Sequence, residues 1–317
     1  MSASDAELRR QAEEASRALQ GALDQALRQL ADLQDASGEA LGPALQGVEA
    51  MLLKAGGRGP EAVARLEQAA ARARVQGDPA AAAWLTARLG LLEIADGEPQ
   101  DGAGRAEEAI GELAGCGRTW AALQVADDLV RALRRAGEIE RARAVGARLQ
   151  DRPWPPEVLE RALQLRVTHA ETALFGGQPE VGDDELRRAC VRADLHHLWR
   201  PQHQAVMARA LFAASQGHIA EAEAHATQAR QLAVTHRHPE RYLSAAQLLA
   251  NLAEQRGDRV AAYGVTVRAV RSLRQLLGPA FDPTGEQLLA NLRARWGDET
   301  YATAAQAYVE SAGGAAH

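Results

Sequence analysis

The sequence predicts an all-α protein, a right-handed α-solenoid built from about seven 40-residue helical hairpins. Glycine recurs every 40 residues without an insertion, at Gly57, Gly97, Gly137, Gly177, Gly217, Gly257 and Gly297. Each glycine separates two runs of apolar residues at helical spacing, which indicates two helices joined by a turn. Aromatic residues make up only 4% of the chain, and β-branched residues are also scarce, so we expect no β-strands.

The composition excludes several classes of protein. The chain has 317 residues, of which 46% are hydrophobic, so it can bury a core. Cys116 and Cys190 are too few for a disulfide framework and favour a reducing compartment, which we take to be the cytoplasm. No uncharged apolar run approaches the ~20 residues of a membrane span, so we expect no membrane partner. A formal net charge of −6 argues against general nucleic-acid binding.

Residues 1–42 are predicted to form an N-terminal amphipathic helix that caps the array. Its apolar residues recur at steps of three and four, at Leu8, Ala12, Ala15, Leu19, Leu23, Ala26, Leu30 and Leu33. Such a helix would shield the first repeat from water. The alternative is a coiled-coil helix that joins two copies of the chain into a homodimer, although its alanines make a weak seam.

Residues 43–310 are predicted to form the repeat array. The recurring glycine ends the first helix of each pair, because it adopts a left-handed conformation without a Cβ clash. Asp258 and Asp298 follow their glycines and can cap the second helix. A small residue five positions after the glycine lets the two helices approach closely; these residues are Ala62, Gly102, Ala142, Gly182, Ala222, Ala262 and Ala302. The small-residue segment 311–317 is predicted to be a disordered tail.

This pattern resembles the tetratricopeptide repeat (TPR), a helical hairpin that stacks into a superhelix. The residues that match it best are Gly217, Ile219, Ala222 and Ala229. The resemblance covers roughly residues 43–310, but the unit has 40 residues where the family commonly has about 34, so the helices or the linkers must be longer. Longer units resemble the sensor arrays of MalT-like bacterial regulators, whose nucleotide-binding domain and helix-turn-helix have no counterpart in this sequence.

The resemblance also implies candidate site residues, since the first helix of each TPR lines a concave groove in which a peptide binds. Four amides stand ten and six residues before the last two glycines and would contact a peptide backbone: Gln247, Asn251, Gln287 and Asn291. Four arginines of first helices would pair with acidic groups of the ligand: Arg131, Arg134, Arg135 and Arg295. Glu171 occupies the groove-facing position of the fourth repeat. Solvated side chains without a ligand are the alternative.

Histidine is concentrated in one stretch of the chain, at His196, His197, His203, His218, His225, His236 and His238. Stacking of the repeats would bring the turns that hold His196 and His236 near each other. Metal binding, pH-sensitive packing and ordinary linker histidines are the three alternatives. A metal-ligand spacing such as His-Glu-x-x-His is absent from the sequence, so we predict no metal site.

These observations predict a non-catalytic protein–protein interaction module, a scaffold or adaptor that binds a peptide or partner helix in a concave groove. The alternative is a ligand- or peptide-sensing regulator that resembles the MalT-like sensor domain and acts through another chain. The sequence contains neither a nucleophile motif nor a phosphate-binding loop, so we expect neither an enzyme nor a cofactor. The arginine-rich stretch 131–152 lacks the interleaved aromatic residues of a nucleic-acid site.

Overall fold

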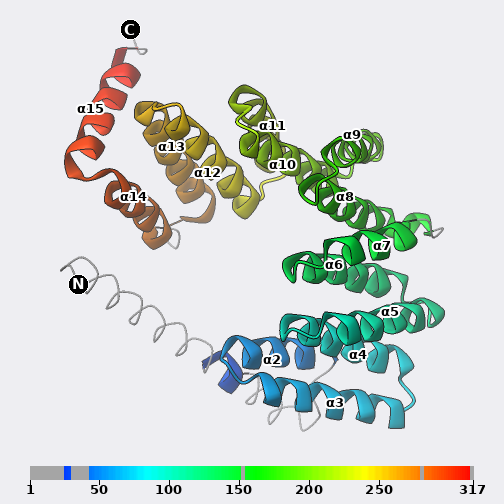
Figure 1. Ribbon diagram of the computed structural model, residues 1–317. Coiled ribbons are helices and arrows are strands. Elements are labelled where there is room, and N and C mark those ends of the chain that lie inside the picture. Colours follow the sequence, from blue (N-terminus) through cyan, green and yellow to red (C-terminus); the bar gives the residue numbers. More distant parts are fainter. Residues whose placement is uncertain (1–24, 30–42, 151–153, 279–281, 315–317) are drawn as a thin grey trace. The chain divides into compact units, whose positions relative to one another are not determined.

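The structure is a computed structural model of the chain. The residues that it describes are 25–29, 43–150, 154–278 and 282–314. They form helices joined by short turns, and no β-strand occurs among them (Figure 1). The predicted all-α class is therefore confirmed for this part of the chain. The chain divides into two compact units, Met1–Leu165 (unit 1) and Arg166–His317 (unit 2).

Within each unit, every helix packs against the helix that follows it in the sequence. The helices of unit 1 are α2 (Pro43–Ala55), α3 (Gly59–Val75), α4 (Pro79–Ala95), α5 (Pro99–Gly115), α6 (Thr119–Arg135), α7 (Ile139–Gln150) and the 3-10 helix η1 (Pro156–Val158). Helix α8 (Leu159–Phe175) contains the boundary between the units. Unit 2 continues with α9 (Pro179–Leu195), α10 (Trp199–Ser215), α11 (Ile219–Thr235), α12 (Pro239–Gln255), α13 (Arg259–Leu277), α14 (Asp282–Trp296) and α15 (Asp298–Gly314).

The 40-residue period consists of two nearly identical halves. Helices α3 to α6 and α9 to α12 each have 17 residues, and three-residue turns connect them, so a turn occurs every 20 residues. The seven predicted glycines all have positive φ, as do Gly77 and Gly117 between them. Two turns use other residues in this conformation, His197 (φ 56°) and Arg237 (φ 51°). The length beyond a 34-residue unit therefore lies in the helices.

The ends of the array agree with the predicted boundaries only in part. Helix α2 begins at Pro43, where the array was predicted to begin. Of the predicted cap, only residues 25–29 are described; they are helical, and Leu27 packs against a buried cluster of α2 to α4. The other residues of the cap lie outside the described part. Helix α15 continues to Gly314, so residues 311–314 of the predicted tail are helical.

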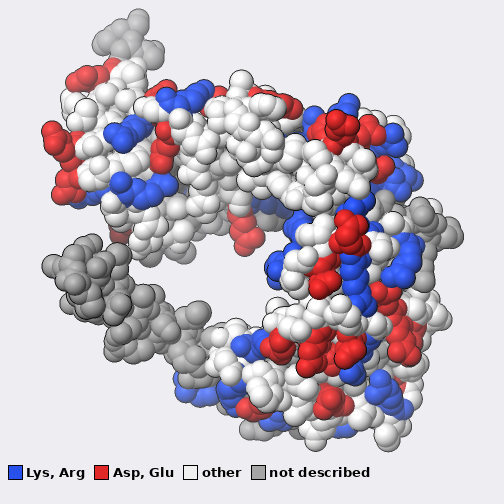
Figure 2. Space-filling model, viewed as in Figure 1, with Lys and Arg blue, Asp and Glu red and all other residues white. Residues whose placement is uncertain are grey.

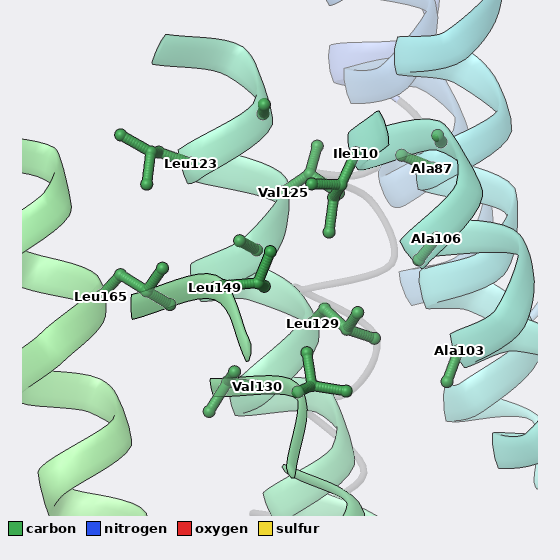
Figure 3. Close-up of a cluster of buried hydrophobic side chains, with 14 of the residues drawn as sticks. Ala87, Ala103, Ala106, Ile110, Leu123, Val125, Leu129, Val130, Leu149 and Leu165 are labelled. Atoms are coloured by element: carbon green, nitrogen blue, oxygen red, sulfur yellow. The ribbon is translucent and has the colours of Figure 1, made fainter. Parts of the chain in front are cut away.

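Small residues let consecutive helices touch in unit 1. Gly102 of α5 lies against the carbonyl of Gly90 in α4, and a Cβ on Gly102 would come within 2.9 Å of the Ile94 nitrogen. Alanines fill the equivalent buried positions, and leucines, isoleucine and valines occupy the space beside them (Figure 3). Six of the seven predicted close-packing positions are buried, but Ala302 is exposed, so the prediction is wrong there. Ala302 lies in α15, beyond which the described chain has no further helix to cover it.

The predicted cap by Asp258 is present, since its carboxylate accepts a hydrogen bond from the Ala261 nitrogen at 2.8 Å. Asp298 differs, because its carboxylate bonds Arg293 at 2.6 Å. We expect Asp258→Ala to lower the free energy of unfolding by about 1 kcal/mol, measured by urea denaturation. Glu98 holds the same position after Gly97 but makes no cap bond, so Glu98→Ala is the control. Equal effects of the two substitutions would contradict the capping role.

Candidate binding grooves

A groove in unit 2 gathers most of the residues predicted for the amide site. Helices α12, α13 and α14 enclose a cavity of about 560 Å³. Its lining residues are Leu243, Ala246, Gln247, Ala250, Asn251, Thr266, Ala269, Leu288, Asn291, Leu292, Ala294 and Arg295. Four predicted residues from two repeats therefore share this surface, which we call the amide groove. Gln287, the fifth, lies outside the lining, and its Nε2 donates to Asn291 Oδ1 at 2.7 Å.

The amide groove combines an apolar floor with an exposed polar rim. Leu292, Ala246 and Ala250 are buried, whereas Gln247, Asn251 and Asn291 are exposed. An ion pair between Arg295 Nη2 and Glu254 Oε1, 2.8 Å apart, joins α14 to α12 at one end. Exposed amides can donate and accept at the same time, as a peptide backbone requires of its partner. The arrangement therefore suits a neutral, extended ligand better than a highly charged one.

A second groove lies in unit 1, between α2, α4 and α6, and has a volume of about 610 Å³. Its lining residues are Gly47, Ala50, Met51, Lys54, Ala55, Leu66, Arg88, Leu91, Leu92, Ile94, Ala95, Asp128, Ala132, Arg135 and Ala136. It carries three cationic side chains and one carboxylate over an aliphatic floor. We call it the cationic groove. The sequence analysis selected Arg135 as a site residue but missed the other two cations, Lys54 and Arg88.

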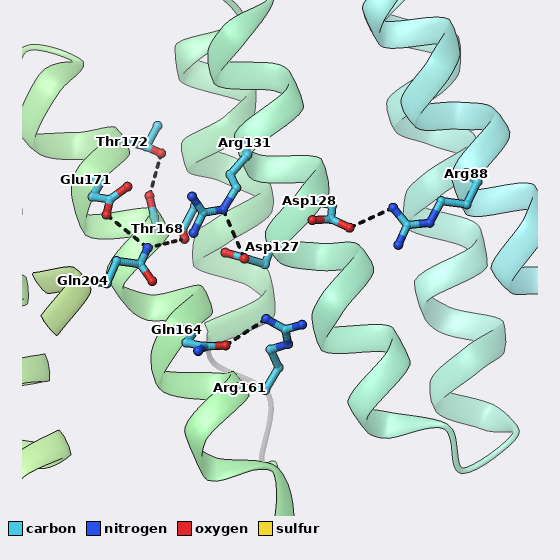
Figure 4. A network of polar contacts seen from close by, with 10 residues as sticks. All are labelled: Arg88, Asp127, Asp128, Arg131, Arg161, Gln164, Thr168, Glu171, Thr172 and Gln204. Atoms are coloured by element: carbon cyan, nitrogen blue, oxygen red, sulfur yellow. Dashed lines mark hydrogen bonds and ion pairs between the residues drawn. The ribbon is translucent and has the colours of Figure 1, made fainter. Parts of the chain in front are cut away.

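The charges of the cationic groove are partly neutralised. Arg88 Nη1 lies 3.0 Å from Asp128 Oδ2, and the Arg88 guanidinium also lies over the Trp84 ring at 4.4 Å (Figure 4). Burial raises the pKa of the Asp128 carboxyl above its ordinary value, while the neighbouring Arg88 opposes that shift. Lys54 pairs with Asp96. Arg135 is exposed, and no described carboxylate pairs with it.

The remaining predicted residues serve contacts within their own units. Arg131 Nε donates to Asp127 Oδ2 at 3.1 Å, one turn away on α6, and that carboxylate is buried. Arg134 is half-buried beside it. Glu171 is buried in α8, where Gln204 Nε2 donates to its Oε1 at 3.1 Å (Figure 4). These three residues are therefore less accessible to a ligand than the amide rim.

The histidine-rich stretch forms a ring cluster in unit 2. Trp199 stacks on His236 with 4.7 Å between ring centroids, so the turns before α10 and α12 are neighbours, as their equivalence in the repeat indicated. His203 is buried, and its Nδ1 lies 3.1 Å from Arg241 Nη1. Among the described residues, no three histidine, cysteine or carboxylate side chains converge as metal ligands.

The surface carries both signs of charge. Figure 2 shows acidic and basic side chains interspersed over the helices on the visible face of each unit. Such mixing gives no extended positive field of the kind that attracts nucleic acid. None of the described helices combines the length and the apolar character that crossing a membrane requires. No protein-family model matches the chain, and no curated protein is significantly similar to it.

Proposed function

We propose that the chain is a TPR-like, right-handed solenoid of seven 40-residue hairpins that binds a peptide or partner helix without catalysing a reaction. One observation carries this proposal: Gln247, Asn251, Asn291 and Arg295, from two repeats, line the same groove of unit 2. A scaffold or adaptor in the cytoplasm is the role that fits such a surface. The two free thiols, Cys116 and Cys190, agree with a reducing compartment.

The chemistry of the amide groove defines the ligand class. An extended peptide presents backbone N–H and C=O groups at regular intervals, and the amides of Asn251 and Asn291 can pair with both. Aliphatic side chains of the peptide would occupy the floor beside Leu288 and Leu292. Because Glu254 already pairs with Arg295, a carboxylate ligand would have to displace an existing ion pair. We therefore propose an uncharged, aliphatic peptide segment.

Peptides selected from a random display library on the full chain provide the test. We expect Asn251→Ala with Asn291→Ala to weaken the selected peptides about tenfold, because two hydrogen bonds of roughly 0.5–1.5 kcal/mol each are lost. Fluorescence anisotropy measures this change. Gln228 and Gln231 are exposed amides of α11 outside the groove, and their joint replacement by alanine is the control. Selection of no peptide, or equal affinity of all three proteins, would refute the proposal.

A second proposal is that the same groove senses a small molecule, as in a ligand-sensing regulator of the MalT-like kind. The volume of about 560 Å³ favours it, because small-molecule sites commonly occupy about 300–1,000 Å³. Thermal unfolding in the presence of a metabolite library distinguishes the two. A metabolite that raises the melting temperature of the native chain but not of the Asn251→Ala, Asn291→Ala variant supports sensing, and peptide binding alone contradicts it.

A further inference from the structure

We infer that residues 1–24 of the chain bind across α2 and the cationic groove of unit 1, and so compete with any other ligand for that groove. This inference does not depend on the amide groove of unit 2. It rests on an uncovered apolar stripe, on complementary charge and on the place where the described chain enters unit 1.

Helix α2 presents an apolar stripe to solvent. Leu45, Val48 and Met51 follow one another at steps of three along one face of the helix, and they are 41%, 45% and 58% exposed. Met51 also lines the cationic groove, so the stripe and the groove form one continuous surface. Residues 1–24 carry a matching stripe in the sequence, with Leu8, Leu19 and Leu23 at helical spacing.

The charges of the two surfaces are opposite. Residues 1–24 contain five carboxylates (Asp5, Glu7, Glu13, Glu14 and Asp24) and three arginines, a side-chain charge of −2. The groove lining contains three cations and one carboxylate, a charge of +2. Arg135 is exposed at its edge, and no described carboxylate neutralises it. An acidic amphipathic segment therefore gains both apolar burial and an ion pair by binding here.

The chain enters unit 1 next to this surface. Leu27 packs against a cluster that includes Ala50, Leu66 and the partly buried Leu92, and these three residues also line the cationic groove. Twenty-four residues span about 36 Å as a helix, whereas the three helices α2, α4 and α6 at usual packing distances span about 20 Å. The segment therefore reaches the whole groove from residue 25. The short tether also favours binding within one chain over binding to a second copy.

Thiol modification of the full chain tests the inference. A cysteine replaces Met51 in one protein and Val75 in another; Val75 is 89% exposed at the end of α3, outside the groove. Both proteins also carry Cys116→Ser, and the remaining thiol, Cys190, reacts slowly because burial raises its pKa to about 11. We expect the cysteine at position 51 to react with a maleimide at least tenfold more slowly than the one at position 75.

Substitutions in the segment and in the groove make the result specific. Leu19→Asp with Leu23→Asp should raise the rate at position 51 at least tenfold and leave the rate at position 75 unchanged. Arg135→Glu should also raise it, and adding Glu13→Arg with Glu14→Arg should slow it again. Equal rates at the two positions, or a rate at position 51 that ignores these substitutions, would overturn the inference. A rate that falls with protein concentration would overturn it in favour of a homodimer.

Discussion

Replacement of Gly102 by alanine is expected to destabilise unit 1 by about 1–3 kcal/mol. The new Cβ would overlap the Gly90 carbonyl oxygen and lie 2.9 Å from both the Ile94 nitrogen and its Cγ1 atom. Backbone atoms cannot rotate away as a flexible side chain can, so α4 and α5 would have to separate. Their separation would expose the buried alanines and Ile110 between them to water.

Gly104 provides a matched control in the same helix, two residues further on. A Cβ at Gly104 would meet no atom within 4 Å. Gly104→Ala should therefore raise stability by about 0.5–1 kcal/mol, because alanine restricts the unfolded chain and favours the helix. Urea denaturation followed by circular dichroism measures both variants. Two variants of equal stability would show that α4 and α5 are not in contact at Gly102.

The sequence predicted the turns of the array because their physics requires a particular residue. A left-handed backbone conformation strongly favours glycine, so a turn every 40 residues left a column of glycines that could be counted. The intermediate turns escaped notice, although the structure shows them at the same spacing. His197 and Arg237 adopt the left-handed conformation without being glycine, which interrupts the second column and hides the 20-residue period.

The candidate site could be predicted only where neighbouring repeats carry the same residue type. Asn251 and Asn291 are such a pair, and the amide groove contains both. Arg88 and Asp128 also occupy equivalent positions, 40 residues apart, but their opposite charges concealed the equivalence until the ion pair was seen. Glu171 shows the reverse error, because a sequence pattern gives its helix position but not the burial that Gln204 and the rest of unit 2 impose.

Acidification is expected to destabilise unit 2 through the buried imidazole of His203. The side chain is 4% exposed, and the Arg241 guanidinium lies 3.1 Å from its Nδ1. A guanidinium can only donate, so Nδ1 must accept and the imidazole must be neutral. Burial, with the nearby charge of Arg241, lowers the pKa of His203 from 6.5 to about 4. Below pH 6.5 a proton therefore binds the unfolded chain more readily than the folded one.

The stability that neutral His203 contributes is complete above pH 6.5 and is lost as the pH falls to about 4. The gap between the two pKa values corresponds to about 3 kcal/mol. We expect His203→Gln, whose amide oxygen can accept from Arg241 but cannot titrate, to lose less stability over this range than the native chain. Burial also lowers the pKa of His225, but that contribution is common to both proteins and cancels in the difference. Urea denaturation at several pH values measures it, and identical pH dependence of the two proteins would contradict the role of His203.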